Sequence, residues 1–297
     1  MCLMAMISLA QVDCDFNYGE FKVDRTVCLF GDKVNVRSKP STTATVVANL
    51  PIGTEVTIVE KTDVTFTIGG YNTNWYYVKF LDKGEEKTGY VWGGLISMAS
   101  IKIPNPGAAD DLFVCSITSW TAQTNFTMTG RLVRNGQVIH TIDFEPISMG
   151  FFDPGEYHHC VCIGVSDGHG FKGVKNIVSL EFVYGACGYE NGKILLFWDG
   201  SKLYYAGKAS AVFEAGVFNY FYSIVYPDDE KNGLSNILKI VQTYEEYVAS
   251  PDDPVPSDTT GMITDESGWI LKREVTLKQY HWDGSKMIAL PEEKVTK

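Results

Sequence analysis

The sequence predicts an all-β protein with a small N-terminal barrel and a larger antiparallel β region. Val, Ile and Thr recur in short runs, and 13% of the 297 residues are aromatic, a bias that favours pleated strands over helices. Several short segments alternate apolar and polar residues, and Gly, Pro and Asp separate them. The hydrophobic fraction of 45% can fill one large core or two ordinary ones.

The N-terminal part reads as a series of short strands. Val34 and Val36 alternate with polar neighbours, which predicts a half-buried strand, and Pro40 with the following Ser/Thr cluster ends it in a loop. Further strands are predicted at residues 46–50, 54–59, 75–80 and 89–93, with turns at 51–53 and 82–87. This order of strands and turns is compact enough for a small barrel.

The order of these motifs resembles the bacterial SH3 domain. The resemblance spans residues 28–97 and is carried by Asn35, Val36, Arg37, Pro40, Gly53, Val56, Trp75, Val78, Gly89, Tyr90 and Val91. It implies a five- or six-stranded barrel that recognises cell-wall peptides or other envelope components. The chain departs from the pattern by a long insert between Val59 and Trp75, which we expect to lengthen a hairpin and to change a binding edge.

An aromatic groove is the physical basis expected for such recognition, because flat rings give a large contact area at low entropic cost. The same strands must also fill the barrel core with alternate aromatic side chains, so each candidate has a core interpretation as well. Arg37 is interpreted as a structural residue tied to the first turn. The candidate ligand-binding residues are Tyr71, Trp75, Tyr76, Tyr90 and Trp92.

A linker is predicted at residues 101–110, which contain two prolines and a glycine. The predicted organisation is a signal-like segment at 1–19, the barrel domain at 20–100, this linker, and a β repeat domain at 111–297.

The predicted repeat domain contains the hexapeptide Trp-Asp-Gly-Ser-Lys-Leu/Met twice, at residues 198–203 and 282–287. Asp-Gly between apolar strands predicts a two-residue hairpin in which both turn residues have positive φ, and Asn135-Gly136 is a weaker copy. The segments before the two strong copies also correspond, at 173–178 and 233–238.

Two or three related units are therefore expected, and they resemble the Trp-Asp-Gly and propeller-like repeats of exported bacterial proteins. A propeller-like arrangement and a sandwich both remain open, because three blades cannot close an ordinary ring. The second unit carries an insertion at 249–268, rich in Pro, Asp, Ser and Thr, which is predicted to be loop-like.

The run His158-His159-Cys160-Val161-Cys162 is the densest cluster of reactive side chains. On a strand, His158, Cys160 and Cys162 share one face, but alternate residues lie about 7 Å apart, so one tetrahedral zinc ion would need ligands from elsewhere. The cluster also offers a Cys–His nucleophile pair, although no helix follows either cysteine. Buried cysteines beside a partly exposed histidine pair are the favoured interpretation, with no catalytic or metal residue assigned.

Two acidic loops, Asp167-Gly-His-Gly170 and Asp228-Asp-Glu230, resemble the calcium loops of propeller repeats. Neither has the full alternating Asp pattern that supplies six or more oxygens, so solvated turn carboxylates are favoured. The sequence has no phosphate-binding Gly-Lys-Ser/Thr loop, dinucleotide fingerprint or His-Glu-x-x-His motif, and no cofactor is predicted.

The N-terminus suggests export. Its first ten residues are almost wholly apolar and resemble the end of a secretory signal cleaved after Ala10, without a basic n-region; a frayed hydrophobic terminus is the alternative. Losing them would reduce the seven cysteines to six, which suits an oxidising compartment, and no disulfide pairing is predicted.

The net charge of −11 argues against nucleic acid and anionic membrane surfaces as partners, and no run is long enough to span a bilayer. The predicted function is that of a non-catalytic, exported cell-envelope binding or scaffolding protein, periplasmic or on the cell surface, with cell-wall peptidoglycan or an envelope protein as partner. The alternatives are a cell-wall hydrolase with a Cys–His nucleophile and a calcium-binding adhesive repeat protein.

Overall fold

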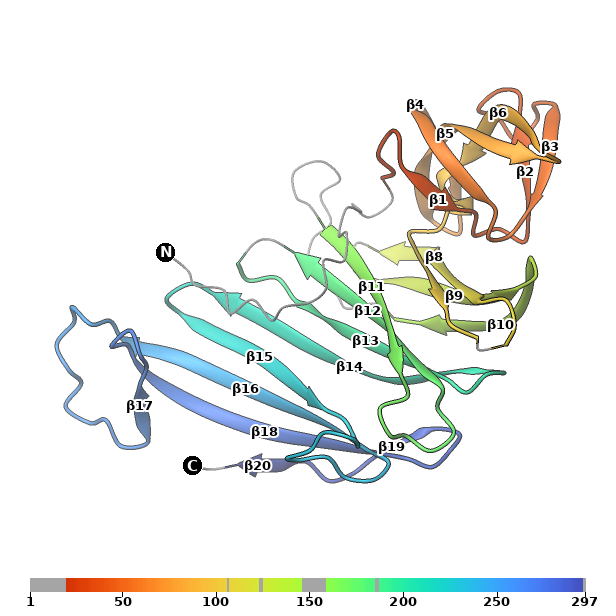
Figure 1. Ribbon diagram of the computed structural model, residues 1–297. Coiled ribbons are helices and arrows are strands. Elements are labelled where there is room, and N and C mark those ends of the chain that lie inside the picture. The colour runs from red at the N-terminus through yellow and green to blue at the C-terminus, as the bar shows by residue number, and fades with distance from the viewer. Residues whose placement is uncertain (1–19, 106, 123–124, 146–158, 185–186, 296–297) are drawn as a thin grey trace. The chain divides into compact units, whose positions relative to one another are not determined.

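A computed structural model of the protein describes residues 20–105, 107–122, 125–145, 159–184 and 187–295 (Figure 1). Apart from one short 3-10 turn, the regular structure of these residues is antiparallel strand, which confirms the all-β prediction. None of their helical segments is long and apolar enough to cross a membrane. The predicted signal-like segment lies outside the described residues.

The chain divides into two compact units. The described residues up to 145, with 159–165 and 180–183, form the first unit, and the remaining described residues form the second.

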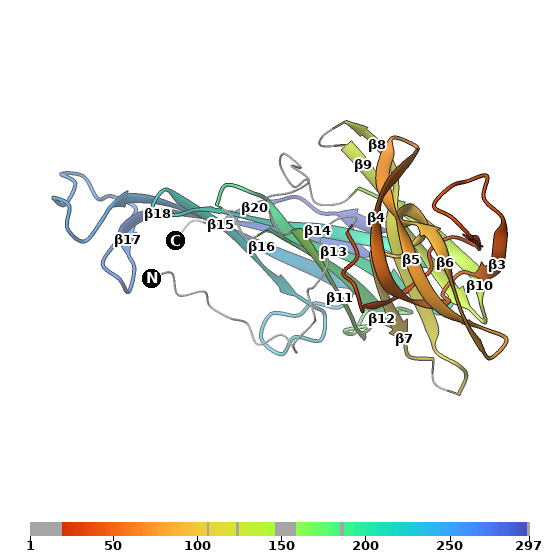
Figure 2. The ribbon, with the colours of Figure 1, turned by 90° about the horizontal axis from the view of Figure 1, so that it is seen from above.

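The first unit begins with a six-stranded curved sheet in the order β1-β4-β5-β6-β2-β3 (Figures 1 and 2). Its strands are β1 (Thr26–Cys28), β2 (Lys33–Arg37), β3 (Val46–Pro51), β4 (Glu55–Ile68), β5 (Tyr71–Asp82) and β6 (Glu85–Trp92), followed by the 3-10 turn η1 (Gly93–Leu95). Alternation in β2 buries Val34 and Val36 completely, as the sequence predicts. They join a core with Leu29, Ile58 and Tyr76.

Arg37 has the structural role expected of it. Its Nη1 donates a hydrogen bond of 2.7 Å to the backbone oxygen of Ala44, which fixes the loop between β2 and β3. The predicted turn at 82–87 is narrower than expected, because only Lys83 and Gly84 lie between paired strands and both have positive φ. Such a two-residue turn matches the twist of its flanking strands.

The first unit also contains a second sheet, of four strands in the order β10-β9-β8-β7. Its strands are β7 (Ala99–Ile103), β8 (Asp111–Ala122), β9 (Asn125–Arg134) and β10 (Gln137–Phe144). The two-residue turn predicted between β9 and β10 is confirmed, since Asn135 and Gly136 have φ of 50° and 70°.

The predicted linker at 101–110 is wrong for its first three residues. Ile101 and Ile103 belong to β7, where Ile101 pairs with Phe113 of β8 and Ile103 is fully buried. The prolines and the glycine that suggested a linker occupy only the loop between these two strands. Paired, half-buried backbone of this kind is not a flexible connection.

The barrel and the second sheet share a core, here called the seam. It joins Cys28, Phe30 and Ile52 of the barrel part to Val114 and Val133 of the sheet. The boundary predicted near residue 100 therefore lies inside one compact unit. Apolar side chains buried from both sides hold two sheets together in the same way as an ordinary domain core.

The insert between Val59 and Trp75 lengthens the β4–β5 hairpin, as expected. At its tip, the backbone oxygen of Gly69 accepts a hydrogen bond of 2.8 Å from the backbone nitrogen of Trp120 in β8. The ring of Tyr71 lies parallel to that of Trp120, with 6.2 Å between centroids and 7° between planes. The insert thus makes a second attachment between the barrel and the four-stranded sheet.

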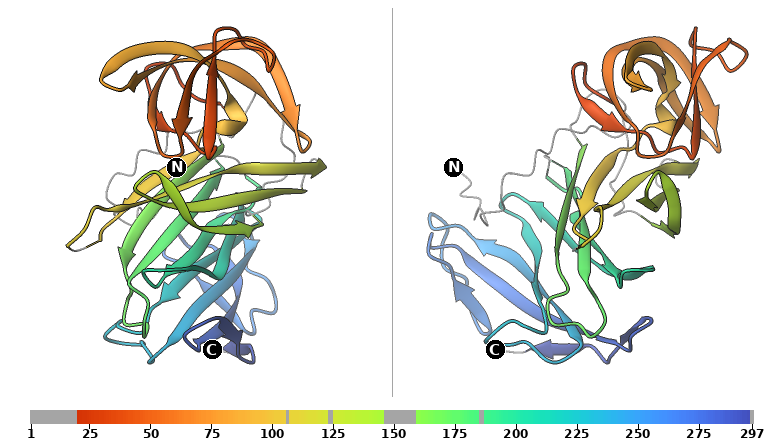
Figure 3. Two further views of the ribbon diagram at one scale, coloured as in Figure 1. Left: turned by 90° about the vertical axis from the view of Figure 1, so that its right-hand side faces the viewer. Right: turned by 45° about the vertical axis from the view of Figure 1, so that its right-hand side comes forward.

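A third sheet, of ten antiparallel strands, has the order β11-β12-β13-β14-β15-β16-β18-β17 (Figure 3). Two further strands of this sheet, β19 and β20, also pair with β18. The strands are β11 (His159–Asp167), β12 (Asn176–Tyr184), β13 (Asn191–Trp198), β14 (Leu203–Glu214), β15 (Phe218–Val225), β16 (Ile237–Ala249), β17 (Met262–Thr264), β18 (Ile270–Trp282), β19 (Met287–Ala289) and β20 (Glu293–Val295). Within the described residues, the related segments are successive strands of one sheet rather than separate blades. The predicted insertion at 249–268 is a loop, except for the short strand β17 within it.

The two Trp-Asp-Gly hairpins differ from the predicted two-residue turn. Each loop has four residues, 199–202 and 283–286, and positive φ occurs at Gly200 and Gly284. The reason is an aspartate cap: Oδ1 of Asp199 accepts backbone hydrogen bonds of 2.7 Å from both Ser201 and Lys202.

The second copy of the turn repeats these hydrogen bonds. Oδ1 of Asp283 accepts backbone hydrogen bonds of 2.8 Å from Ser285 and 2.9 Å from Lys286. An Asp side chain that replaces a backbone acceptor in this way allows a wider turn. The shared hexapeptide therefore encodes a capped turn that follows a buried tryptophan, Trp198 or Trp282.

We expect Gly70→Ala to destabilise the protein far more than Gly84→Ala. Both glycines have positive φ, so each substitution costs about 1 kcal/mol of backbone strain. A Cβ at Gly70 would also lie 1.9 Å from the backbone oxygen of Trp120, whereas a Cβ at Gly84 meets nothing within 4 Å. Urea unfolding of the full chain should show an additional loss of about 2 kcal/mol or more for Gly70→Ala. Equal losses would contradict the described docking of the hairpin tip.

We expect the capped turn at Asp199 to be sensitive to acid. Desolvation raises the pKa of this carboxyl, but hydrogen bonds from Ser201, Lys202 and Tyr204 outweigh it and hold the pKa below its ordinary value. A depressed folded-state pKa gives stability that is present above the unfolded pKa and is lost as pH falls through the folded one.

Asp199→Asn keeps an acceptor but removes the charge, so it should lower the free energy of unfolding near neutral pH by on the order of 1 kcal/mol. The difference from the wild type should disappear as pH falls through the folded pKa of Asp199. Thermal unfolding across pH measures both curves, and Glu293→Gln on the exposed strand β20 is the control. If the difference in stability between Asp199→Asn and the wild type persisted unchanged in acid, the lowered pKa assigned to Asp199 would be wrong.

Candidate functional site

Four of the five predicted ligand-binding side chains are buried in the barrel. Tyr71, Trp75, Tyr76 and Trp92 expose between 0% and 5% of their surface. Trp92 donates from Nε1 to the backbone oxygen of Phe66 at 2.8 Å. Burial raises the pKa of Tyr71 to about 12, which keeps its hydroxyl neutral. The structure places these four residues in the core and leaves them little surface for a ligand.

Tyr90 is the fifth candidate, and it is half-exposed. Its ring lies against that of Tyr77, with 4.9 Å between centroids, and the Tyr77 hydroxyl donates to Oγ1 of Thr88 at 2.7 Å. Tyr77 was missed by sequence reasoning, although its position next to the buried Tyr76 places it on the opposite face of β5. The two tyrosines form a fixed aromatic pair on the outer face of β5 and β6.

A cleft with a volume of ≈ 680 Å³ lies within the first unit, between the barrel and the β9–β10 hairpin. Its lining residues are Asp32, Lys33, Asn49, Pro51, Arg131, Gly136, Gln137, Val138 and Thr141. Sequence reasoning missed this cleft because it assigned the two sets of lining residues to separate domains. Only the seam between those sets creates the concave surface.

Arg131 anchors the cleft. Its Nη1 donates a hydrogen bond of 3.0 Å to the backbone oxygen of Phe30, and its guanidinium carbon lies 4.4 Å from the Phe30 ring centroid. A cation over an aromatic face is attracted to the negative face of the ring. The exposed Lys33 adds a second cation, while Asn49 and Gln137 supply amide groups. The lining therefore combines two cations, the carboxylate of Asp32 and two side-chain amides.

The predicted cysteine–histidine cluster is only partly described. β11 begins at His159, which confirms the predicted strand, but the side chains of His158, His159 and Cys160 lie outside the described residues. Cys162 is buried and disulfide-bonded. A disulfide sulfur is not a thiolate nucleophile.

Among the cysteines that the structure describes, Cys28, Cys115 and Cys187 are free, and of these three only Cys187 is exposed. Burial raises the pKa of the Cys28 thiol, although a hydrogen bond with Ser100 partly offsets the effect. Burial also raises the pKa of Cys115 to about 12. Neither of these two buried thiols has the lowered pKa of an activated nucleophile.

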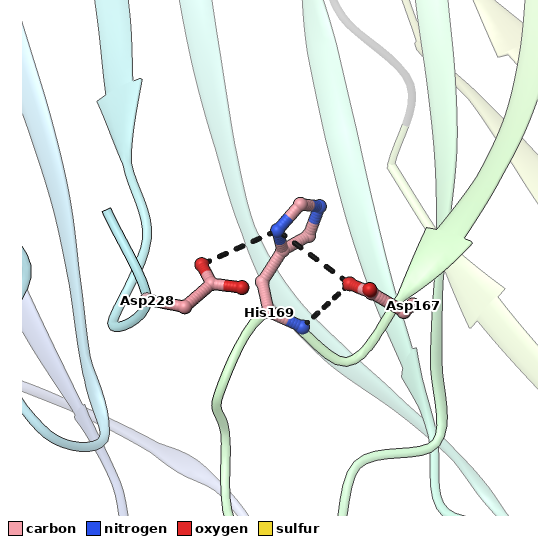
Figure 4. Close-up of side chains that lie close together, drawn as sticks. All are labelled: Asp167, His169 and Asp228. Atoms are coloured by element: carbon pink, nitrogen blue, oxygen red, sulfur yellow. Dashed lines mark hydrogen bonds and ion pairs between the residues drawn. The ribbon is translucent and has the colours of Figure 1, made fainter. Parts of the chain in front are cut away.

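The two acidic loops singled out in the sequence come together in the second unit (Figure 4). Nδ1 of His169 lies 3.6 Å from Oδ1 of Asp167 and 3.4 Å from Oδ1 of Asp228. The His169 ring also stacks on Tyr226, with centroids 4.2 Å apart. The sequence indicated both loops but not their proximity, since Asp228 follows β15 and the other two residues lie at the end of β11 and just after it.

Comparison with known proteins identifies the barrel. Residues 32–97 match the bacterial SH3 domain family, which agrees with the resemblance carried by the motifs. No curated protein and no solved structure matches the chain. Bacterial SH3 domains bind cell-wall or protein partners in general. Residues 32–97 are therefore a bacterial SH3 domain, which the seam joins to the four-stranded sheet.

Proposed function

We propose that this protein is a non-catalytic binding or scaffolding protein of the cell envelope, whose SH3 domain recognises a cell-wall peptide or an envelope protein. The observation that carries the proposal is the cleft beside the SH3 domain, lined by Lys33 and Arg131. Bacterial SH3 domains occur in cell-envelope proteins, which supports an exported location.

The size and chemistry of the cleft suit a short peptide. Ligand pockets commonly enclose roughly 300–1,000 Å³ and often lie where two structural parts meet. Lys33 and Arg131 can pair with a peptide carboxylate, and Asp32 can pair with an amine. Asn49 and Gln137 suit backbone amides. An acidic peptide stem, or an acidic segment of a protein, has this combination of groups.

The buried and oxidised cysteines support a non-catalytic role. Cys162 is held in a disulfide bond, and burial raises the pKa values of Cys28 and Cys115. A Cys–His hydrolase requires a thiolate within reach of a positioned base. None of these three cysteines supplies such a thiolate, which removes Cys162 from the Cys–His pair considered for the hydrolase alternative.

We expect Lys33→Glu to weaken retention of the full-length protein on purified peptidoglycan by about tenfold, equal to ~1.4 kcal/mol. The change reverses the charge of an exposed residue at the cleft, so a ligand carboxylate would meet repulsion there. Co-sedimentation over a range of peptidoglycan concentrations gives the affinity. Lys39→Glu, exposed in the β2–β3 loop, is the matched control and should bind like the wild type.

A second arm of the same experiment distinguishes a cell-wall peptide from an envelope protein as the ligand. Glycan strands stripped of their peptides should retain no protein if a cell-wall peptide is recognised. Equal binding of wild type and Lys33→Glu would exclude the cleft as the binding place. If intact peptidoglycan retains neither the wild type nor any variant, a cell-wall peptide is excluded as the ligand. An envelope protein would then be the partner.

We expect a thiol reagent to modify Cys187 in the native protein well before Cys28 or Cys115, because only the first is exposed among these three. Peptide mass spectrometry after timed labelling measures the order, and Cys187→Ser is the control that removes the fast site. Rapid native labelling of Cys115 would contradict its burial. A fast, low-pKa thiol at any other cysteine would favour the hydrolase alternative.

A further inference from the structure

We propose that Asp167, His169 and Asp228 form a binding site for a zinc-type divalent cation in the second unit. The three side chains offer one imidazole nitrogen and two carboxylate groups, and their ligand atoms lie within 4.8 Å of one another. Figure 4 shows the two aspartates on either side of the imidazole. The inference rests on this geometry and does not depend on the function proposed for the SH3 domain.

The two loops are held together by contacts outside the cluster. Trp282, which precedes the second capped turn, bridges the two loops. Its Nε1 donates a hydrogen bond of 3.0 Å to the backbone oxygen of Lys172, and its backbone nitrogen donates one of 2.8 Å to the backbone oxygen of Asn236. Oδ1 of Asn236 also accepts from the backbone nitrogen of Lys172 at 2.8 Å. The loop that carries His169 and the loop that carries Asp228 are thus fixed relative to each other by the fold.

The histidine ring is held in place as well. It lies nearly parallel to Tyr226, at 15° between planes, so that its Nδ1 faces both carboxylates. Asp167 is oriented by a hydrogen bond of 3.0 Å that its Oδ1 accepts from the backbone nitrogen of His169. His169 and Asp167 therefore start from a defined arrangement, which lowers the entropic cost of binding, while Asp228 is brought beside them by its loop.

Both nitrogen–oxygen separations are compatible with a bound ion. Nδ1 carries at most one proton, and its separations of 3.4 Å and 3.6 Å from the two carboxylate oxygens exceed the usual N–H···O range of roughly 2.7–3.2 Å. Two ligand atoms of a tetrahedral ion, each bonded at about 2.0–2.1 Å, lie about 3.4 Å apart. Each nitrogen–oxygen separation is therefore close to the edge of such a tetrahedron.

The donor set selects zinc over calcium. Calcium takes 6–8 oxygen ligands, and an imidazole nitrogen is a poor substitute for one of them. Zinc accepts His nitrogen and Asp oxygen, and three protein ligands leave a fourth position for water. Two carboxylates would also neutralise the charge of a divalent ion. The donor set thus points to a zinc-type cation at two loops for which the sequence favoured solvated turn carboxylates over a calcium site.

A bound cation would cross-link the β11–β12 loop to the β15–β16 loop. The strand pairs that carry these loops are separated by β13 and β14 in the order of the sheet. A ligand that binds only the folded state raises the free energy of unfolding with the logarithm of its concentration relative to its dissociation constant. We therefore expect a structural role for the ion, namely to hold this end of the curved sheet together.

The test uses the full-length protein, first treated with a chelator and then titrated with zinc chloride. Isothermal titration should show one zinc bound at this site, and the melting temperature should rise by several degrees at saturating zinc. Calcium chloride at the same concentration should leave the melting temperature unchanged.

Three conservative variants test the ligands one at a time. Asp167→Asn keeps the acceptor of the turn, Asp228→Asn keeps the side-chain shape, and His169→Asn suits the positive φ of 45° at that position. Each should bind zinc at least about tenfold more weakly, a loss of ~1.4 kcal/mol or more. Asp283→Asn removes a turn carboxylate of the same kind outside the cluster and should bind zinc like the wild type.

The proposal is overturned by a wild-type protein whose melting temperature does not respond to zinc. Undiminished zinc binding by all three variants would place the metal elsewhere in the chain. A response to calcium but not zinc would refute the choice of cation. Circular dichroism of each chelator-treated variant establishes that it is folded, and two folded variants suffice to decide the question.

Discussion

The seam between the SH3 barrel and the second sheet determines what the N-terminal half of this protein can do. Phe30 and Ile52 from one side meet Val114 and Val133 from the other, and all four are almost completely buried. Arg131 closes this apolar contact by holding the Phe30 backbone and ring. Asp32, Lys33 and Asn49 of the barrel line the cleft together with Arg131, Gln137 and Thr141 of the attached sheet.

The chain passes from barrel to sheet without a flexible connection. The backbone nitrogen of Ser97 donates to Cys28 of the barrel, and that of Met98 donates to Cys115 of β8, each at 2.8 Å. One residue later β7 begins. The β4–β5 hairpin adds a second attachment at Trp120, far along the chain from the first. Two attachments at separate points restrict rotation between the barrel and the sheet, so the cleft is preformed before a ligand arrives.

The sequence predicted local features well and juxtapositions poorly. Alternation located β2, and Asn-Gly located the β9–β10 turn, because both depend on neighbouring residues alone. Burial of the aromatic candidates was harder to predict, because the curvature of the barrel decides which rings point inward. Tyr76 is buried in the barrel, whereas its neighbour Tyr77 is half-exposed.

The same limit explains the remaining errors. The prolines after Ile103 suggested a linker, and the pairing partner that makes Ile101 part of a strand lies beyond them in the chain. The Trp-Asp-Gly turn was assigned the wrong length because a side-chain cap, rather than backbone φ alone, determines its shape. His169 and Asp228 were each noticed, but only the order of strands in the sheet brings them together.

The overall charge of −11 and the two proposed sites are compatible because electrostatic interactions in salt are short-ranged. At physiological ionic strength the Debye length is about 8 Å, so a small ligand responds to the nearest groups and not to the whole protein. Lys33 and Arg131 make the cleft locally favourable for a carboxylate, whereas Asp167 and Asp228 make their loops favourable for a cation. A polyanion such as nucleic acid spans many Debye lengths and would meet the net negative charge. The charge distribution is therefore compatible with both a small acidic peptide at the cleft and a single metal ion at the two acidic loops.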